Sequence, residues 1–137
     1  MELRVPARVE SLAVVRAMVG CLAHYEELTG DTAGDLALAV DEASTVLIGM
    51  AAPRAILVLV VDPGVDGLRV RVSTACDSVH DELGSAGLSG FSRRVLESLA
   101  EEVDTFVDDL DLDQTGEPTP VLGISLTVRR DGFSARG

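Results

Sequence analysis

Residues 36–51, LALAVDEASTVLIGMA, constrain the fold more than any other part of the chain. Apolar residues recur in this segment at steps of three and four, which is the period of a helix with one face turned to a core. These residues are Leu36, Val40, Ala43, Leu47 and Met50. Glu42 lies off that face, on a side of the helix that is less polar than a solvated side should be. We expect its carboxylate either to be buried beside a partner or to line a pocket, the simpler alternative being a solvated residue beside Asp41.

The hydrophobic residues of the chain are almost all aliphatic. They make up 47% of its 137 residues, and one Tyr and three Phe are its only aromatic side chains. A chain of this length buries enough apolar surface to fold as one domain without disulfides or a structural metal. We expect a single domain over residues 1–130, with a core of Val, Leu, Ile and Ala, and a flexible tail over residues 131–137.

The charge balance narrows the choice of partners. Asp and Glu number 23 against 11 Lys and Arg, which gives a formal net charge of −12. Such a chain repels phosphate backbones and anionic lipid, and attracts basic protein surfaces. We therefore expect no direct binding to nucleic acid or to membranes.

The sequence does not predict a metal centre or a membrane span. Cys21 and Cys76 lack metal-ligand spacing and are expected to be reduced thiols, and His24 and His80 are too scattered for a zinc site. The longest apolar run, residues 55–61, is much too short to cross a bilayer. We expect a soluble, cytoplasmic protein without a metal site of its own.

Periodicity divides the chain into strands and helices. Alternation over residues 2–9 predicts a strand, and Pro6 places it at a sheet edge because proline has no N–H for the ladder. Residues 10–28 and 31–52 are expected to be helices, and Pro53 ends the second. The other expected elements are strands at 55–61, 68–74, 104–107 and 121–129, a loop at 75–90, a helix at 92–102 and an exposed connection at 108–120.

This order of elements predicts an α+β fold, a two-layer sandwich in which the helices cover one face of a mixed β-sheet. The helix at 92–102 is expected to bury apolar residues against the core. Its expected buried residues are Phe91, Val95, Leu96, Leu99 and Val103.

Four segments resemble one known family across nearly the whole chain. They are ESLAVVRAMV at 10–19, LALAVDEASTVLIGMA at 36–51, GFSRRVLESLAEEVDTF at 90–106 and GISLTVRR at 123–130. Together they resemble the histidine-kinase-like (GHKL, or Bergerat-fold) ATPase domain of the RsbW-type anti-sigma serine kinases. Within that family they look most similar to the divergent actinobacterial sigma F antagonists of the UsfX type.

The resemblance implies roles for individual residues. In active members, a Glu on the second helix orients the attacking hydroxyl or water, and an Asn four residues later holds the magnesium ion. Here Glu42 stands at the first position and is the catalytic candidate, whereas Val46 stands at the second. An isopropyl group cannot ligate a hard cation that needs oxygen.

The other nucleotide motifs are altered too. Active members read the adenine amino group with an Asp followed by Gly-x-Gly; Thr74 occupies that position, and Asp77 follows three residues later without a Gly-x-Gly. A Gly-Leu-Gly-Leu motif, whose backbone amides approach the phosphates, corresponds here to residues 90–93, so that Gly90 remains and Ser92 replaces the second glycine. Ser92 still offers an amide to an anion, or is simply a helix N-cap. Binding of ATP and magnesium is therefore expected to be weak or absent.

Three functions remain open at this point. The resemblance and the excess of acid favour an anti-sigma factor, which sequesters an alternative sigma subunit of the sigma F or sigma B type and is released by an anti-sigma-factor antagonist. Glu42 favours a working serine/threonine kinase that phosphorylates the antagonist, and the altered motifs oppose it. The third is a partner-binding domain unrelated to transcription.

The resemblance also implies a homodimer, because relatives commonly form one. The strand at 2–9 offers an open ladder for pairing. Glu10, Ser11 and Arg16 are candidates for partner-facing residues, because their segment carries part of the family resemblance.

Overall fold

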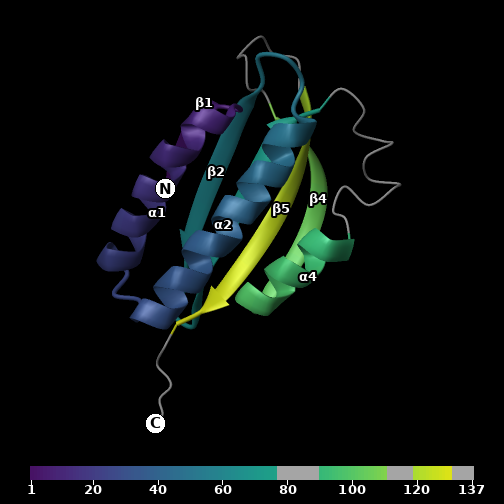
Figure 1. The fold of residues 1–137 in the computed structure, drawn as a ribbon. Helices are drawn as coiled ribbons and strands as arrows, with labels where there is room; N and C mark the ends of the chain where they lie inside the picture. The colour runs from purple at the N-terminus through teal and green to yellow at the C-terminus, as the bar shows by residue number, and fades with distance from the viewer. Residues whose placement is uncertain (77–89, 111–118, 131–137) are drawn as a thin grey trace.

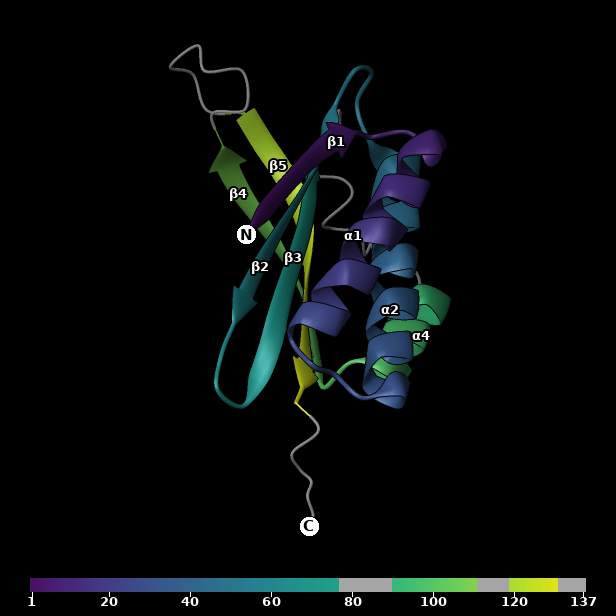
Figure 2. The same cartoon turned by 90° about the vertical axis from the view of Figure 1, so that its left-hand side faces the viewer.

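The computed structural model describes residues 1–76, 90–110 and 119–130, and in these residues three α-helices cover one face of a five-stranded sheet (Figure 1). The strands are β1 (Glu2–Pro6), β2 (Ile56–Pro63), β3 (Gly67–Ala75), β4 (Glu102–Leu110) and β5 (Thr119–Arg129). The helices are α1 (Leu12–Tyr25), α2 (Gly30–Met50) and α4 (Gly90–Leu99), with a short 3-10 helix, η1 (Val9–Ser11), before α1. The predicted α+β architecture in two layers is confirmed, as Figure 2 shows from the side.

The strand order is β1-β2-β3-β5-β4, and each neighbouring pair is antiparallel. The prediction of a mixed sheet is wrong for a topological reason. The crossover through α4 makes β3 and β4 parallel in direction, but β5 lies between them and is antiparallel to both. The predicted edge position of the first strand is confirmed, since among the described residues β1 pairs only with β2.

Local signals position α2 as the sequence predicts. The hydroxyl of Thr29 accepts a hydrogen bond from the backbone N–H of Thr32 at 3.5 Å, which caps the start of the helix. The helix ends at Met50, shortly before Pro53. Its predicted core face is buried, and Met50 packs partly against the same core; the fully buried members are Leu36, Val40, Ala43 and Leu47.

The largest boundary error concerns β4, which covers Glu102–Leu110 rather than only 104–107. Its nine residues pair with β5 along their whole length, so residues 108–110 and 119–120 of the expected connection belong to strands. The helix predicted at 92–102 begins at Gly90 and ends at Leu99. Most of the loop predicted at 75–90 lies outside the described residues, as does the tail predicted at 131–137.

The prediction that Phe91 is buried is wrong, because its side chain is 74% exposed. Ser92 and Leu96 are the buried residues of α4, and Leu99 packs partly against the core. These residues follow one another at steps of four and three and define the inner face of the helix. Phe91 precedes Ser92 by one residue, so its side chain is rotated by roughly 100° about the helix axis, away from that face. The predicted burial of Leu96 and Val103 is confirmed.

The face of the sheet opposite the helices has one closely fitted contact. The ring of Phe106 on β4 lies where a Cβ atom at Gly123 on β5 would be, so the glycine makes room for the ring. The guanidinium group of Arg71 on β3 stacks over the same ring, 4.3 Å from its centroid. None of the helices in the described part of the chain combines the length and apolar content needed to cross a membrane.

Candidate functional site

The structure brings Glu42 and Ser92 together across the seam between α2 and α4. The Ser92 hydroxyl donates a hydrogen bond to the Glu42 carboxylate, with 3.0 Å between Oγ and Oε2. Glu42 is half-buried and Ser92 is 9% exposed, so little water competes for this contact. The partner of the carboxylate is therefore a neutral hydroxyl from a segment fifty residues away in sequence.

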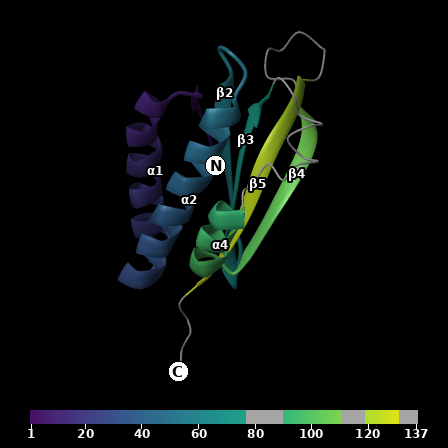
Figure 3. The ribbon, with the colours of Figure 1, turned by 45° about the vertical axis from the view of Figure 1, so that its right-hand side comes forward.

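The direction of α4 explains how the two residues meet. α4 packs beside α2 on the β4 side of the helical layer (Figure 3). The first turn of α4 lies beside Glu42. Ser98, near the end of α4, lines a cavity together with Asp35, which lies nearer the start of α2. The two helices are therefore antiparallel, and the side of α2 that carries Asp35 and Glu42 is turned to α4.

Val46 lies one turn after Glu42 on the same side of α2. Its side chain is half-buried and packs against the hydrophobic core. The residue thus presents only hydrocarbon at the position where active relatives are expected to carry a magnesium ligand.

Thr74 lies near the end of β3 and is fully buried. Its hydroxyl donates to the backbone carbonyl of Ile56 on the neighbouring strand, at 2.9 Å. This bond satisfies the buried hydroxyl and ties β3 to β2. Thr74 therefore has a structural role in the sheet. Asp77, the other candidate for base recognition, lies outside the described residues.

Gly90 is the first residue of α4 and is exposed. A Cβ atom added there would meet nothing within 4 Å among the described residues. The glycine is therefore not required by close packing against that part of the molecule. Ser92, two residues later, is fixed by its hydrogen bond to Glu42.

These residues do not fit magnesium-bound ATP in the way active relatives are expected to hold it. Val46 supplies no oxygen, and the Thr74 hydroxyl is directed to a backbone carbonyl. Within residues 1–76, 90–110 and 119–130, no group of three or more His, Cys, Asp or Glu side chains is arranged to hold a metal ion. The Glu42 carboxylate could orient a substrate hydroxyl, but in this structure it accepts a hydrogen bond from the hydroxyl of Ser92 in the same chain.

A salt bridge beside Glu42 joins α1 to α2. Arg16 Nε donates to Asp41 Oδ1 at 2.7 Å. The hydrogen bond and the negative charge of Asp41 raise the pKa of Arg16 above its ordinary value. Because Arg16 pairs with Asp41 of α2, its positive charge is balanced within the chain.

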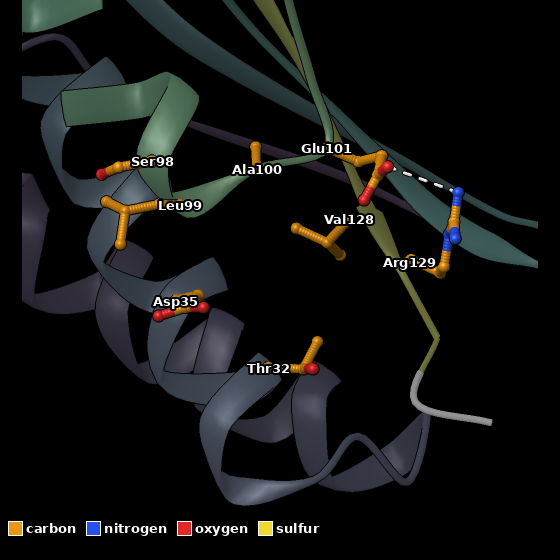
Figure 4. A pocket seen from close by; sticks show the side chains of 8 residues that line it. All are labelled: Thr32, Asp35, Ser98, Leu99, Ala100, Glu101, Val128 and Arg129. Atoms are coloured by element: carbon orange, nitrogen blue, oxygen red, sulfur yellow. Dashed lines mark hydrogen bonds and ion pairs between the residues drawn. The ribbon is translucent and has the colours of Figure 1, made fainter. Parts of the chain in front are cut away.

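Sequence reasoning missed a polar cavity at the other end of the seam, with a volume of about 270 Å³ (Figure 4). It lies between the start of α2, the end of α4, the two residues that lead from α4 into β4, and the end of β5. The Arg129 guanidinium lies 3.3 Å from the Glu101 carboxylate at its rim. Its lining residues are Thr32, Asp35, Ser98, Leu99, Ala100, Glu101, Val128 and Arg129. No motif marks them, because they come from two helices, one strand and the segment between α4 and β4.

The two-layer architecture, with Glu42 on the second helix beside the first turn of α4, is consistent with the histidine-kinase-like (GHKL) class of ATPase domains. No protein-family model matches the chain. The anti-sigma-F factors RsbW of Mycobacterium tuberculosis strains CDC 1551/Oshkosh and ATCC 25618/H37Rv are each 46% identical to it over 134 residues, which is 98% of this chain and 76% of the relative. The chain belongs to the RsbW family of anti-sigma-F factors.

Proposed function

We propose that this protein binds an alternative RNA polymerase sigma subunit of the sigma F type and keeps it from the polymerase. The observation that carries the proposal is the relationship to the anti-sigma-F factors, which extends over 98% of the chain. The net charge of −12 supports it, because sigma subunits carry basic surfaces for DNA and opposite charges speed and orient their encounter.

Co-elution in gel filtration tests this proposal. The chain is mixed with the organism's own sigma F-type subunit at low and at high salt. A complex should form at both salt concentrations and should prevent the sigma subunit from initiating transcription with core polymerase in vitro. Failure to co-elute at either salt concentration would remove the proposal.

The proposed role includes release by an anti-sigma-factor antagonist and location in the cytoplasm, where polymerase is found. Glu10 is the best placed of the three partner-facing candidates, because it is exposed. Ser11 is only 8% exposed, and Arg16 is paired with Asp41. Glu10→Arg should therefore weaken sigma binding more than Ser11→Ala does.

We further propose that nucleotide has at most a minor part in this function, and that Glu42 anchors α4 rather than activating a phosphoacceptor. The hydrogen bond from Ser92 and the hydrocarbon side chain of Val46 support this proposal. A lost metal ligand and a lost base-reading carboxylate each weaken binding by about 1 to 3 kcal/mol. Calorimetry with ATP and magnesium tests it, and saturable micromolar binding that Glu42→Ala abolishes would contradict it.

The second candidate function is an active serine/threonine kinase that phosphorylates the antagonist. The presence of Glu42 in the first position of the motif favours it. Incubation of the chain and the antagonist with ATP and magnesium, followed by mass spectrometry, decides the question. Phosphate transfer that Glu42→Gln abolishes would establish the kinase.

A further inference from the structure

A second cavity lies where β1 ends and β2 begins, with a volume of about 360 Å³. Pro6 lies opposite Ile56 in the sheet, so the cavity is at the end of these two strands that adjoins the start of α1 (Figure 2). Its lining residues are Pro6, Ala7, Arg8, Arg54, Ala55 and Ile56. Apart from the two arginines these residues are apolar, so the cavity combines hydrocarbon surface with positive charge.

The charges of Arg8 and Arg54 are not balanced within the described part of the chain. Both residues are exposed, and neither forms an ion pair with a residue in 1–76, 90–110 or 119–130. The chain is rich in acid, and five other arginines do pair with a carboxylate, namely Arg4, Arg16, Arg93, Arg129 and Arg130. A guanidinium group binds a carboxylate or phosphate through two parallel hydrogen bonds. Two such groups at one cavity therefore suit an anionic ligand.

The backbone holds Arg54 in a conformation that few side chains adopt. Its φ angle is 64°, in the left-handed region. Arg54 is the third residue of a turn in which Pro53 is the second, and the N–H of Ala55 closes the turn by donating to the Ala52 carbonyl at 3.0 Å. A type II turn of this kind favours Gly or Asn at its third position. Strained residues are typical of ligand-binding sites, so the strain supports a role for the Arg54 side chain beyond the turn.

Hydrogen bonds within the chain fix the other side of the cavity. The N–H of Arg8 donates to the carbonyl of Pro6 at 2.8 Å, and the carbonyl of Arg8 accepts from the N–H of Ser11 at 2.9 Å. Ala7 donates to the carbonyl of Ala55 at 2.9 Å and thereby joins the two sides. The backbone of the cavity is therefore ordered before a ligand arrives, which lowers the entropic cost of binding.

We propose that this cavity binds an acidic peptide segment of a partner protein, in which carboxylate side chains flank an aliphatic one. The guanidinium groups of Arg8 and Arg54 pair with the carboxylates, and the aliphatic side chain packs against Ile56 and the other apolar lining residues. Val9, next to Arg8, is 68% exposed and extends the apolar surface beyond the cavity. This extension favours a peptide over a small ligand confined to the cavity.

The charge of this cavity distinguishes its ligand from the basic sigma surface proposed above. The net charge of −12 attracts basic surfaces to the chain as a whole, whereas the cavity is a local exception of opposite sign. The same net charge repels a nucleic-acid backbone, which carries many phosphates. A short peptide with few carboxylates meets less repulsion. The inference goes beyond sigma binding and does not depend on it.

A nuclear magnetic resonance titration of the ¹⁵N-labelled full chain tests the inference. The probe is the peptide acetyl-Ser-Glu-Leu-Glu-Ser-amide. It should cause saturable shifts of the amide signals of Ala7, Ala55 and Ile56, with a dissociation constant below about 1 mM. Replacing both Glu residues of the peptide by Gln should weaken binding about tenfold, because the charged hydrogen bonds are lost. Replacing its Leu by Gly should also weaken binding, because the apolar contact is lost.

Variants of the two arginines locate the binding. Arg8→Gln and Arg54→Gln should each raise the dissociation constant of the peptide about fivefold or more. Arg94→Gln is the matched control, because Arg94 is exposed on α4 and the variant removes the same charge away from the cavity. It should bind the peptide like the wild type.

Arg54→Gly separates the role of the side chain from that of the turn. Glycine adopts a positive φ angle without strain, so this variant should unfold at a temperature no lower than that of the wild type. It should nevertheless bind the peptide as weakly as Arg54→Gln does. A clear fall in the thermal midpoint would show that the Arg54 side chain stabilises the fold, and would contradict the proposal.

The remaining outcomes each decide the question. A peptide that does not bind, or that binds equally well with Gln in place of Glu, removes the cavity as a site for acidic segments. Arg8→Gln and Arg54→Gln variants that bind like Arg94→Gln place the peptide elsewhere on the chain. Loss of sigma co-elution in both cavity variants, but not in Arg94→Gln, would assign the cavity to the sigma interface and overturn a separate partner. A wild type that fails to bind sigma leaves the peptide result standing.

Discussion

Arg130→Ala is expected to lower the free energy of unfolding by about 2 to 3 kcal/mol, because it leaves a largely buried carboxylate without its cation. Arg130 Nη2 donates to the Glu26 carboxylate at 2.5 Å, and Nη1 donates to the Glu26 carbonyl at 3.2 Å. Its Nε donates to the carbonyl of Gly64 at 2.8 Å. The Arg130 and Glu26 side chains are 27% and 12% exposed, so water replaces these bonds poorly. The end of α1, the β2-β3 turn and the end of β5 are thereby joined.

Thermal unfolding followed by far-UV circular dichroism at neutral pH measures the effect. For a domain of this size, a loss of about 2 to 3 kcal/mol lowers the midpoint by roughly 6 to 12 °C. Arg129→Ala is a matched control, because the adjacent Arg129 also pairs with a glutamate, at 3.3 Å, but its side chain is 70% exposed. An exposed pair contributes at most about 1 kcal/mol, so the control should lose no more than roughly 4 °C.

Equal midpoints for Arg129→Ala and Arg130→Ala would refute the reasoning, because they would show that the shielding of the Arg130 contact from water has no energetic consequence. The double variant Glu26→Gln/Arg130→Gln should recover part of the loss, since no buried charge is then left unpaired.

Three further predictions test the site and the core. Ser92→Ala should lower the free energy of unfolding, measured in urea, by about 1 kcal/mol, because the hydrogen bond to Glu42 is lost. The loss should exceed that of Ser98→Ala, since the Ser98 hydroxyl bonds a backbone carbonyl at the surface. Equal effects would show that the Glu42 contact contributes nothing. Ser44→Ala should raise the free energy of unfolding by up to about 1 kcal/mol, because the fully buried Ser44 hydroxyl has no hydrogen-bond partner among the described residues. A clear decrease in the free energy of unfolding would contradict this. A ligand at or below its dissociation constant adds at most about 0.4 kcal/mol to the free energy of unfolding. If ATP binds weakly, millimolar ATP and magnesium should therefore raise the thermal midpoint by less than roughly 2 °C. A rise above roughly 5 °C would disprove weak binding.

The helices were the most predictable part of the fold, because their signals are local. The core face of α2 follows from its own spacing, and Pro53 marks where it stops. The antiparallel character of the sheet depends instead on where β5 inserts, and no local pattern specifies that position. The length of β4 has the same origin, since its acidic second half is held in a strand by pairing with β5.

The candidate site was only partly predictable, for a similar reason. Periodicity singled out Glu42 as an unusual carboxylate. Family resemblance, rather than spacing, placed Ser92 among the site residues. Its contact with Glu42 joins residues fifty positions apart, and no pattern in the sequence predicted it. The bond from Thr74 to Ile56 and the contacts of Arg130 depend on strand register and chain crossing, which the sequence does not display.

The central place of β5 has a consequence for synthesis on the ribosome. In the described residues β4 pairs with β5 alone, and β3 needs β5 on its second side. Until residues 119–129 have left the exit tunnel, two hydrogen-bonding edges stay open and α4 has no finished sheet to rest on. The domain is therefore completed after translation of its last strand rather than during it, and the nascent chain must be shielded from aggregation until then.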